Sequence, residues 1–112
     1  MNRGEIRWYT FRSPDKRRPV LILTRNSAIR YLNGVTIAPI TSTIRNIPSE
    51  VALTPADGLA NDCAVNCDNM QTVPKANIGA FIARLSTAKM QAVQSAIEFS
   101  LGFEAPEEQI ST

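Results

Sequence analysis

Alternation of apolar and polar residues along the chain predicts a protein built mainly from short β-strands. Within residues 4–11, Ile6 and Trp8 alternate with Glu5 and Arg7, which is the period-2 pattern of a half-buried strand. Apolar runs bounded by Pro, Gly, Asn and Asp predict further strands at residues 18–24, 35–40, 50–53, 63–73 and 78–85. Five or six short strands of this kind favour a small antiparallel sheet.

Two prolines constrain where the predicted strands begin and end. Proline has no N–H donor, so Pro19 is expected at the start of the second strand. Pro39, near the end of the third strand, indicates an edge or bulge position. The turn-rich residues 12–16, which include Ser-Pro-Asp, predict antiparallel pairing of the first two strands.

A C-terminal helix is expected to lie on this sheet. Ser86 is the expected N-cap, and Gly102 is the expected stop. A short irregular or helical segment is expected within residues 26–34. Between Ser86 and Gly102, apolar side chains recur at helical spacing: Met90, Val93, Ile97 and Leu101.

The resulting fold class is mainly β (α+β): a strongly bent antiparallel sheet or open barrel with a C-terminal helix. No internal repeat or linker divides the chain. We therefore expect one domain, residues 1–103, followed by an acidic, flexible tail, residues 104–112, that carries Glu104, Glu107 and Glu108.

Composition is that of a globular domain, with 44% hydrophobic and 20% charged residues among 112. The longest apolar runs fall well short of the roughly 18–20 residues of a membrane span, and residues 1–5 do not resemble a signal peptide. We therefore expect a cytoplasmic protein without a membrane partner.

The two cysteines, Cys63 and Cys67, indicate neither a disulfide nor a metal site. On one extended strand they would be about 13 Å apart, whereas a disulfide needs Cα atoms within about 7 Å. A zinc site needs about four ligands, and the chain has no histidine. We expect both thiols to be buried or half-buried packing residues.

Charge is divided unevenly along the chain. Residues 1–45 hold nine cations and two acids, a net charge of +7, whereas residues 46–112 carry a net charge of −5. Eight of these nine cations are arginine, which suits bidentate phosphate contacts and stacking on bases. The pattern fits a polyanion-binding face, and it fits equally a solvated face neutralised by the acidic half.

The most basic stretch leads directly into a buried strand. Lys16, Arg17 and Arg18 precede Pro19 and an apolar run, so a cation is held on a rigid element. This arrangement suits phosphate chemistry, although it is also compatible with a basic turn before a core strand. The hydroxyls at residues 41–43 follow the third predicted strand, where such groups commonly bond the loop backbone.

Five motifs in order resemble those of the MazF/PemK-like toxins, the ribonucleases of toxin–antitoxin pairs. Residues 3–8 (Arg-Gly-Glu-Ile-Arg-Trp) resemble the family's Gly-(Asp/Glu)-Ile/Val-x-Trp opening, and residues 18–23 (Arg-Pro-Val-Leu-Ile-Leu) its Arg-Pro strand. Residues 38–42 (Ala-Pro-Ile-Thr-Ser) resemble its Pro-x-Thr-Ser segment. Residues 68–73 and 82–86 resemble the two motifs that precede the terminal helix.

The resemblance implies an SH3-like barrel of the CcdB/PemK type that forms a homodimer. It implies metal-independent, sequence-specific cleavage of single-stranded RNA, which blocks translation and growth, and no cofactor. It also implies a cognate MazE-like antitoxin, whose acidic segment covers the RNA groove.

The family's catalytic arginine and threonine carry over to Arg18 and Thr41. Attack by the RNA 2′-hydroxyl would give 2′,3′-cyclic phosphate and 5′-hydroxyl ends, with Arg18 stabilising the charge that builds on the phosphoryl oxygens. Thr41 would hydrogen-bond a phosphoryl oxygen or the nucleophile. The other positions expected to bind RNA are Lys16, Arg17, Ser42, Asp68, Gln71 and Arg84.

Two features of the chain depart from the family pattern. The loop before Arg18 is shorter than in many members and lacks the glutamate sometimes assigned as base, which leaves Asp15 and Asp68 as candidates. Asn69 and Gln71 stand where the family usually has glutamine and a cation.

Two further hypotheses do not need Arg18 or Thr41: a non-catalytic CcdB-like toxin that binds a protein such as DNA gyrase, and a non-catalytic RNA-binding module.

Overall fold

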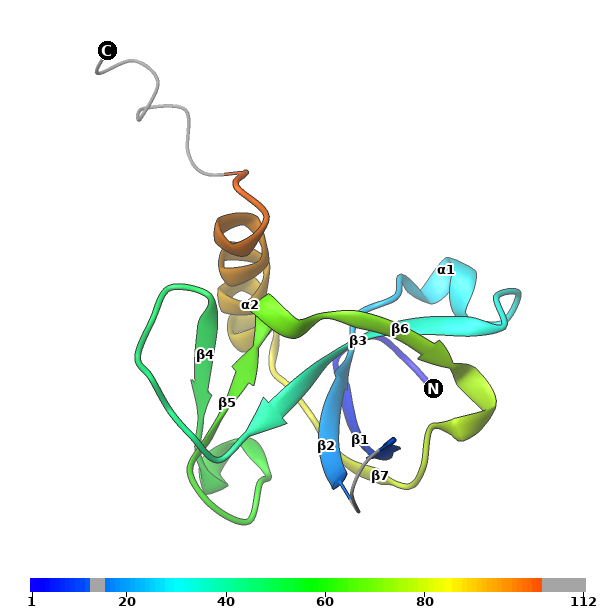
Figure 1. Ribbon diagram of the computed structural model, residues 1–112, viewed down its shortest axis with the longest axis horizontal. Helices are drawn as coiled ribbons and strands as arrows, with labels where there is room; N and C mark the ends of the chain where they lie inside the picture. Colours follow the sequence, from blue (N-terminus) through cyan, green and yellow to red (C-terminus); the bar gives the residue numbers. More distant parts are fainter. Residues whose placement is uncertain (13–15, 104–112) are drawn as a thin grey trace.

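The computed structural model describes residues 1–12 and 16–103, which form one strongly curled antiparallel sheet and a C-terminal helix (Figure 1). This confirms the predicted mainly β class with its bent sheet. The predicted acidic tail, residues 104–112, lies outside the described residues. The strands are β1 (Glu5–Phe11), β2 (Lys16–Ile22), β3 (Gly34–Thr41), β4 (Glu50–Leu53), β5 (Cys63–Asn66), β6 (Gln71–Pro74) and β7 (Phe81–Arg84).

The helical elements are short except for the last. Helix α1 covers Asn26–Ile29 and helix α2 covers Thr87–Ser100. Single 3₁₀ turns lie at η1 (Pro55–Asp57), η2 (Cys67–Asn69) and η3 (Lys75–Asn77). Among the described residues, no helix combines the length and the apolar character needed to cross a membrane.

The sheet curls because β3 changes partners along its length. Neighbouring strands follow the order β4-β5-β3-β2-β1-β7, and β6 also pairs with β3. The first half of β3 pairs with β6, from Gly34 to Ile37, whereas Ile40 and Thr41 pair with β5. Pro39 lies at this change of partner, which agrees with the irregular position predicted for it.

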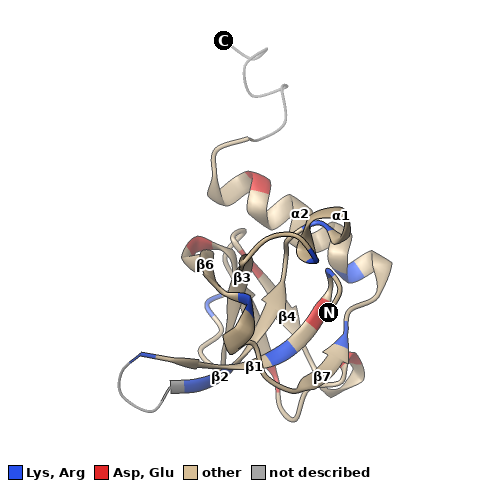
Figure 2. Cartoon of the chain, turned by 90° about the vertical axis from the view of Figure 1, so that its right-hand side faces the viewer, with Lys and Arg blue, Asp and Glu red and all other residues tan. Residues whose placement is uncertain are grey.

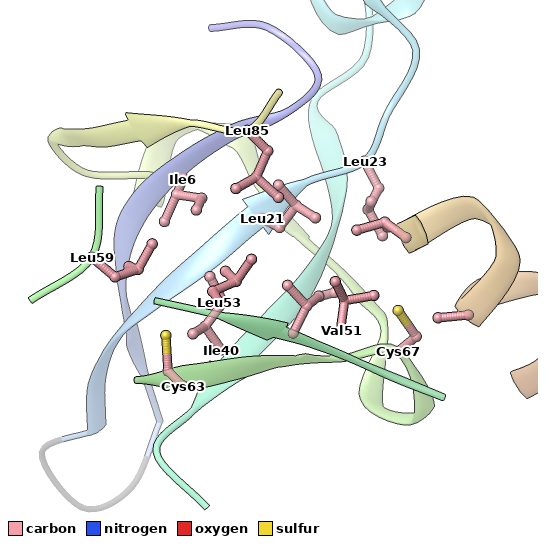
Figure 3. Packing of buried hydrophobic residues seen from close by; sticks show 14 of the residues in the cluster. Ile6, Leu21, Leu23, Ile40, Val51, Leu53, Leu59, Cys63, Cys67 and Leu85 are labelled. Atoms are coloured by element: carbon pink, nitrogen blue, oxygen red, sulfur yellow. The ribbon is translucent and has the colours of Figure 1, made fainter. Parts of the chain in front are cut away.

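Both faces of the central sheet are buried, in two hydrophobic clusters. Leu21 and Leu23 point into the larger cluster, which includes residues of β4, β5 and α2 (Figure 3). Val20 and Ile22 point into a smaller cluster with Val35, Ile37 and Val73 of β3 and β6. Burial on both faces explains why β2 is a continuous apolar run and does not alternate.

Helix α2 begins and ends as the sequence predicts. The Ser86 hydroxyl accepts a hydrogen bond from the Lys89 N–H at 3.1 Å, and Gly102 adopts φ of +84° beyond the last turn. The helix side chains that are fully buried are Val93 and Ala96. The helix therefore contacts the sheet through one narrow stripe.

Strand β2 begins at Lys16, two residues earlier than predicted, so the expected place of Pro19 at the strand start is wrong. Pro19 stands opposite Trp8. Trp8 uses its own N–H and C=O to bond Ala80 and Gly79 at 3.0 and 2.7 Å, on the side away from β2. Trp8 and Pro19 therefore form a non-hydrogen-bonded pair. Pairing of β2 with β1 needs no N–H from residue 19, so proline is tolerated inside the strand.

The single strand predicted at residues 63–73 is wrong, because η2 divides it into β5 and β6. The Asn66 side-chain oxygen accepts from the Asp68 N–H at 3.0 Å, and this local bond turns the chain out of the strand. Cys63 and Cys67 therefore do not share a strand. Both are free and buried, as expected.

The strand predicted at residues 78–85 is shorter than expected, because η3 and an extended segment precede β7. Gly79 lies against β1 so closely that a Cβ there would come within 3.0 Å of the Trp8 carbonyl oxygen. The register between β1 and β7 also shifts between Ile6 and Arg7. Close packing of backbone on backbone thus replaces regular pairing before Phe81.

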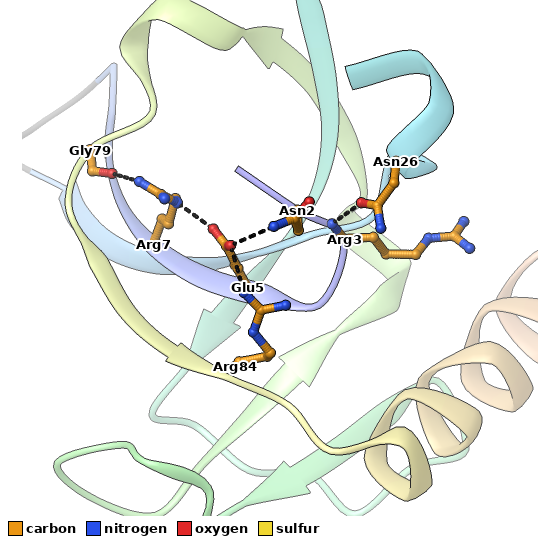
Figure 4. Close-up of polar contacts among 7 residues, drawn as sticks. All are labelled: Asn2, Arg3, Glu5, Arg7, Asn26, Gly79 and Arg84. Atoms are coloured by element: carbon orange, nitrogen blue, oxygen red, sulfur yellow. Dashed lines mark hydrogen bonds and ion pairs between the residues drawn. The ribbon is translucent and has the colours of Figure 1, made fainter. Parts of the chain in front are cut away.

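A buried carboxylate links β1 to β7, which the alternation in β1 did not predict (Figure 4). Glu5 is only 4% exposed. Its Oε1 accepts from Arg7 Nε at 2.8 Å, and its Oε2 accepts from Arg84 Nη2 at 3.1 Å and from Asn2 Nδ2 at 3.4 Å. Burial raises the pKa of Glu5, but the hydrogen bond and charge of Arg7, with the contacts of Asn2, leave it below 4.5.

We expect Glu5→Gln to lower the free energy of unfolding at pH 7 by about 2 kcal/mol. This loss is smaller than that for breaking a fully buried ion pair, because the Arg84 partner is exposed. Because the folded-state pKa is lowered, the stabilisation by Glu5 is fully present above pH 4.5 and is lost as the pH falls through the lowered pKa. Urea unfolding at pH 7 and pH 3 measures this. Glu98→Gln, which changes an exposed acid, is the control. Equal losses of unfolding free energy in Glu5→Gln and Glu98→Gln would contradict the prediction.

Candidate active site

Arg18 and Thr41 lie at the point where β2 and β3 separate. The two strands pair at Val20–Pro39, and continuing that register by two residues places Arg18 opposite Thr41. Because side chains alternate along a strand, Arg18 shares the face of Val20, and Thr41 shares the face of Pro39. The two side chains predicted to be catalytic therefore project from the same face of adjoining strand ends.

An open groove of about 670 Å³ lies on this face. Side chains from the β1–β2 pair form one wall, and the segment through η2 into β6 forms the other. Its lining mixes apolar and polar side chains: Phe11, Arg18, Pro39, Asp68, Asn69, Met70 and Gln71. The fold thus brings Arg18 together with Asp68 and Gln71, which are about 50 residues away along the chain.

The Asp68 carboxylate is held in place by groups beneath the groove. Ser49 Oγ donates to Asp68 Oδ2 at 2.6 Å, and the Asp68 N–H donates to Asn66 Oδ1 at 3.0 Å. Ser49 is only 2% exposed, so the donor of this contact is buried while Asp68 itself is exposed. No hydrogen bond to Asp68 Oδ1 is found among the described residues, so this oxygen has the capacity to accept one from a ligand.

The Arg18 guanidinium is available to bind an anion. The ion pairs found within residues 1–12 and 16–103 are made by Arg7, Arg84 and Lys89, not by Arg18. Arg18 is half-buried beside Tyr9 and Phe11, whose rings pack edge to face with centroids 4.8 Å apart. Arg18 therefore presents a guanidinium donor from a strand position whose cross-strand neighbours are aromatic.

The hydroxyls that follow β3 have different surroundings. Thr41 is half-buried, and its Oγ1 accepts from the Thr43 N–H at 3.1 Å, which leaves the hydroxyl hydrogen free to donate outward. Ser42 is exposed at the start of the following loop. Neither residue is among those that line the groove; Thr41 ends β3, two residues beyond Pro39, which does line it.

Two other basic residues predicted to bind RNA lie apart from the groove. Arg84 is on β7, where its guanidinium bonds Glu5. Arg17 points to the opposite face of β2 from Arg18, and its guanidinium carbon lies 4.0 Å from the centroid of the Trp8 ring. Figure 2 shows basic positions on β1 and β2. The side chain of Lys16 lies outside the described part.

Neither cysteine can serve as a nucleophile near neutral pH. Burial, followed by the charge of Asp68, raises the pKa of Cys67 to about 11. Burial also raises the pKa of Cys63, with smaller contributions from Asp57 and Asp62. Since the thiolate is the reactive form, both thiols are packing groups.

A family model described as the PemK-like, MazF-like toxin of type II toxin–antitoxin systems matches residues 2–101. The chain belongs to this family. Endoribonuclease MazF3 of Mycobacterium tuberculosis is 43% identical over 83 residues, which covers 74% of this chain and 81% of the relative. The probable endoribonuclease MazF5 of the same organism is 37% identical over 100 residues, or 88% of this chain and 91% of the relative.

Solved structures of MazF toxins have the same fold as this MazF-like toxin. Mycobacterium tuberculosis toxin MazF-mt6 superposes with a TM-score of 0.82 at 37% identity, covering 90% of this chain and 99% of that one. A mycobacterial endoribonuclease in complex with its cognate antitoxin gives a TM-score of 0.83 at 29% identity, covering 95% and 99%. These names favour the endoribonuclease hypothesis over a CcdB-like toxin that binds a protein target.

Two contributors to the site of this MazF-like toxin escaped sequence analysis. Ser49 gave no signal, because it lies in a polar loop and meets Asp68 only through tertiary packing. Phe11 was assigned only to the first strand, although its position two residues beyond Tyr9 on an alternating strand could have placed both rings on the Arg18 face.

Proposed function

We propose that this MazF-like toxin is a metal-independent endoribonuclease that cleaves single-stranded RNA at short sequences and thereby blocks translation and growth. The observation that carries the proposal is a single groove that holds the Arg18 guanidinium, which forms no ion pair with the residues that the structure describes, together with the anchored carboxylate of Asp68. Thr41 ends β3 where β2 and β3 separate, two residues beyond Pro39 of the groove. An acceptor and a fixed cation are the two groups that the reaction requires.

The proposed reaction needs no co-reactant. The ribose 2′-oxygen forms a bond to phosphorus while the bond from phosphorus to the 5′-oxygen breaks. Asp68 takes the proton of the 2′-hydroxyl as general base, and the 5′-oxygen leaves with a proton from water. The products are a 2′,3′-cyclic phosphate and a 5′-hydroxyl. DNA has no 2′-hydroxyl, so it is not a substrate.

Arg18 and Thr41 stabilise the transition state in this scheme. Negative charge builds on the two non-bridging phosphoryl oxygens, and a guanidinium held beside them stabilises that charge without reorganising. The Thr41 hydroxyl donates to one of the same oxygens. Arg17, Lys16, Ser42 and Gln71 bind the flanking nucleotides. Arg84 has no part in the proposed groove, since Glu5 occupies its guanidinium.

The proposed partners follow from the family and from the surface of α2. A cognate MazE-like antitoxin would place an acidic segment over the groove and neutralise Arg18. The end of α2 exposes Phe99 and Leu101, at 42% and 58%, which supports a homodimer in which a second copy covers this apolar end. A ribonuclease acting on translated RNA would work in the cytoplasm.

The proposal is tested by incubating the protein with a long single-stranded RNA of varied sequence in excess EDTA. We expect discrete cleavage products, and we expect a DNA strand of the same sequence to remain intact. An RNA that stays intact, or DNA that is cut equally well, would refute the proposed activity. The related CcdB-like and RNA-binding hypotheses predict intact RNA.

A further inference from the structure

The face of β2 opposite the groove carries a preformed cation–aromatic stack. The Arg17 guanidinium carbon lies 4.0 Å from the centroid of the Trp8 ring, well within the roughly 6 Å limit of a cation–π contact. Arg17 is exposed and Trp8 is half-buried, so the arginine forms the outer layer of the stack. Across the strand pair, Arg17 stands opposite Thr10, and both residues are exposed.

The inner layer of this stack is rigidly held. Trp8 donates its N–H to Ala80 O at 3.0 Å and accepts from the Gly79 N–H at 2.7 Å. A side chain at Gly79 would contact the Trp8 carbonyl oxygen and Cβ, at 3.0 and 3.4 Å. The backbone on both sides of Trp8 is therefore fixed, and Arg17 is supported on a platform that exists before any ligand binds.

An RNA strand bound at Arg18 can reach this stack around a free strand edge. Pairing between β2 and β3 begins at Val20, so residues 17–19 of β2 have no β3 neighbour. Pro19 has no N–H to offer on that edge. Arg17 and Arg18 are consecutive and point to opposite faces, with Cα atoms about 3.8 Å apart. A strand that passes over this edge would contact both arginines with neighbouring nucleotides.

We propose that the Trp8–Arg17 stack is a nucleotide subsite in which an unpaired RNA base stacks on the outer face of the Arg17 guanidinium. The inference rests on the proposed ribonuclease activity and assigns Arg17 a base, where the sequence suggested only a phosphate. A guanidinium stacks on the π-face of any base, so the subsite takes every base and favours purines, whose stacking surface is larger. It positions the substrate and takes no part in the chemistry.

Arg17→Lys separates base stacking from simple charge. Lysine keeps the positive charge but has no planar group to stack on a base. We expect KM for RNA cleavage to rise about tenfold, in line with the loss of one base stack, with kcat within about twofold of wild type. The slope of log KM against log salt should stay unchanged, because lysine keeps the positive charge of residue 17 and so preserves any contact that this charge makes with a phosphate. A KM of Arg17→Lys equal to that of wild type would overturn the proposal.

Arg30→Lys is the matched control, because Arg30 is an exposed arginine beyond α1 and away from the groove. We expect KM for this variant to equal that of wild type. An equal rise of KM in Arg30→Lys would show that lysine substitution weakens RNA binding without regard to position, and this too would overturn the subsite.

A binding experiment keeps this inference separate from the proposed activity. Trp8 is the single tryptophan of the chain, so tryptophan emission, excited selectively over the two tyrosines, reports on the surroundings of the stack. RNA homopolymers with 2′-O-methyl riboses have no nucleophile and remain intact. We expect saturable changes in Trp8 emission, at lower concentration for poly(A) than for poly(U). No change in emission upon binding overturns the subsite, whereas binding without cleavage of ordinary RNA overturns only the activity.

Discussion

Replacing Arg18 with alanine should lower kcat for RNA cleavage about 10³-fold, the upper range for losing one preorganised donor to a developing oxyanion. The guanidinium sits at the start of a strand buried on both faces and faces an open groove, without an ion pair to another described residue. Its charge is therefore free for the phosphoryl oxygens. Single-turnover cleavage at saturating protein measures the effect on the chemical step.

Arg18→Lys restores the charge without the bidentate fork, so we expect it to recover only part of the lost rate. Arg45→Ala removes an exposed arginine from the loop after β3 and serves as the control, with a rate close to wild type. If Arg18→Ala is folded and cuts RNA at more than a tenth of the wild-type rate, the chemistry lies outside this groove.

Replacing Asp68 with asparagine should lower kcat about 10²-fold, the lower end of the range for losing a general base. Asparagine has the same shape, and its side-chain oxygen can still accept from Ser49 at the position of Oδ2. The variant therefore tests the proton acceptor and leaves the local structure intact. Initial rates at saturating RNA measure it.

Two further variants, Asp62→Asn and Ser49→Ala, are compared with Asp68→Asn. Asp62→Asn changes an exposed carboxylate outside the groove, and we expect it to cleave at the wild-type rate. Ser49→Ala removes only the anchor of Asp68, so we expect a smaller loss of kcat than in Asp68→Asn. An unchanged kcat in Asp68→Asn would contradict its role as base and leave that role to another group.

The sequence contained most of the fold because its signals are local. The period-2 alternation from Ile6 to Trp8 and the cap at Ser86 each depend on a few neighbouring residues, and both elements form where predicted. The two breaks in the later strands were missed for different reasons. The segment before β7 depends on packing of the Gly79 backbone on Trp8, a tertiary contact that leaves no pattern along the chain. The turn at η2 depends on the local bond from the Asp68 N–H to Asn66 Oδ1, which the spacing of apolar residues did not reveal.

The candidate site was predictable to a similar extent. Motif order predicted Arg18 and Thr41 as catalytic residues and Asp68 as an RNA-binding residue without assigning a base, and the fold places Arg18 and Asp68 at one groove. The sequence could not distinguish the three adjacent cations by face. Alternation along β2 directs Arg18 to the groove and Arg17 to Trp8, and Glu5 engages the more distant Arg84. The side-chain environment, and not the charge itself, separates their roles.

The most direct test of the central claim is the chemistry of the RNA ends produced in excess EDTA. Attack by the 2′-oxygen predicts fragments that end in 2′,3′-cyclic phosphate and begin with 5′-hydroxyl, as read by mass spectrometry. A single 2′-O-methyl group at the mapped nucleotide should abolish that cut. Fragments with 5′-phosphate and 3′-hydroxyl ends, or cleavage that survives 2′-O-methylation, would contradict the account.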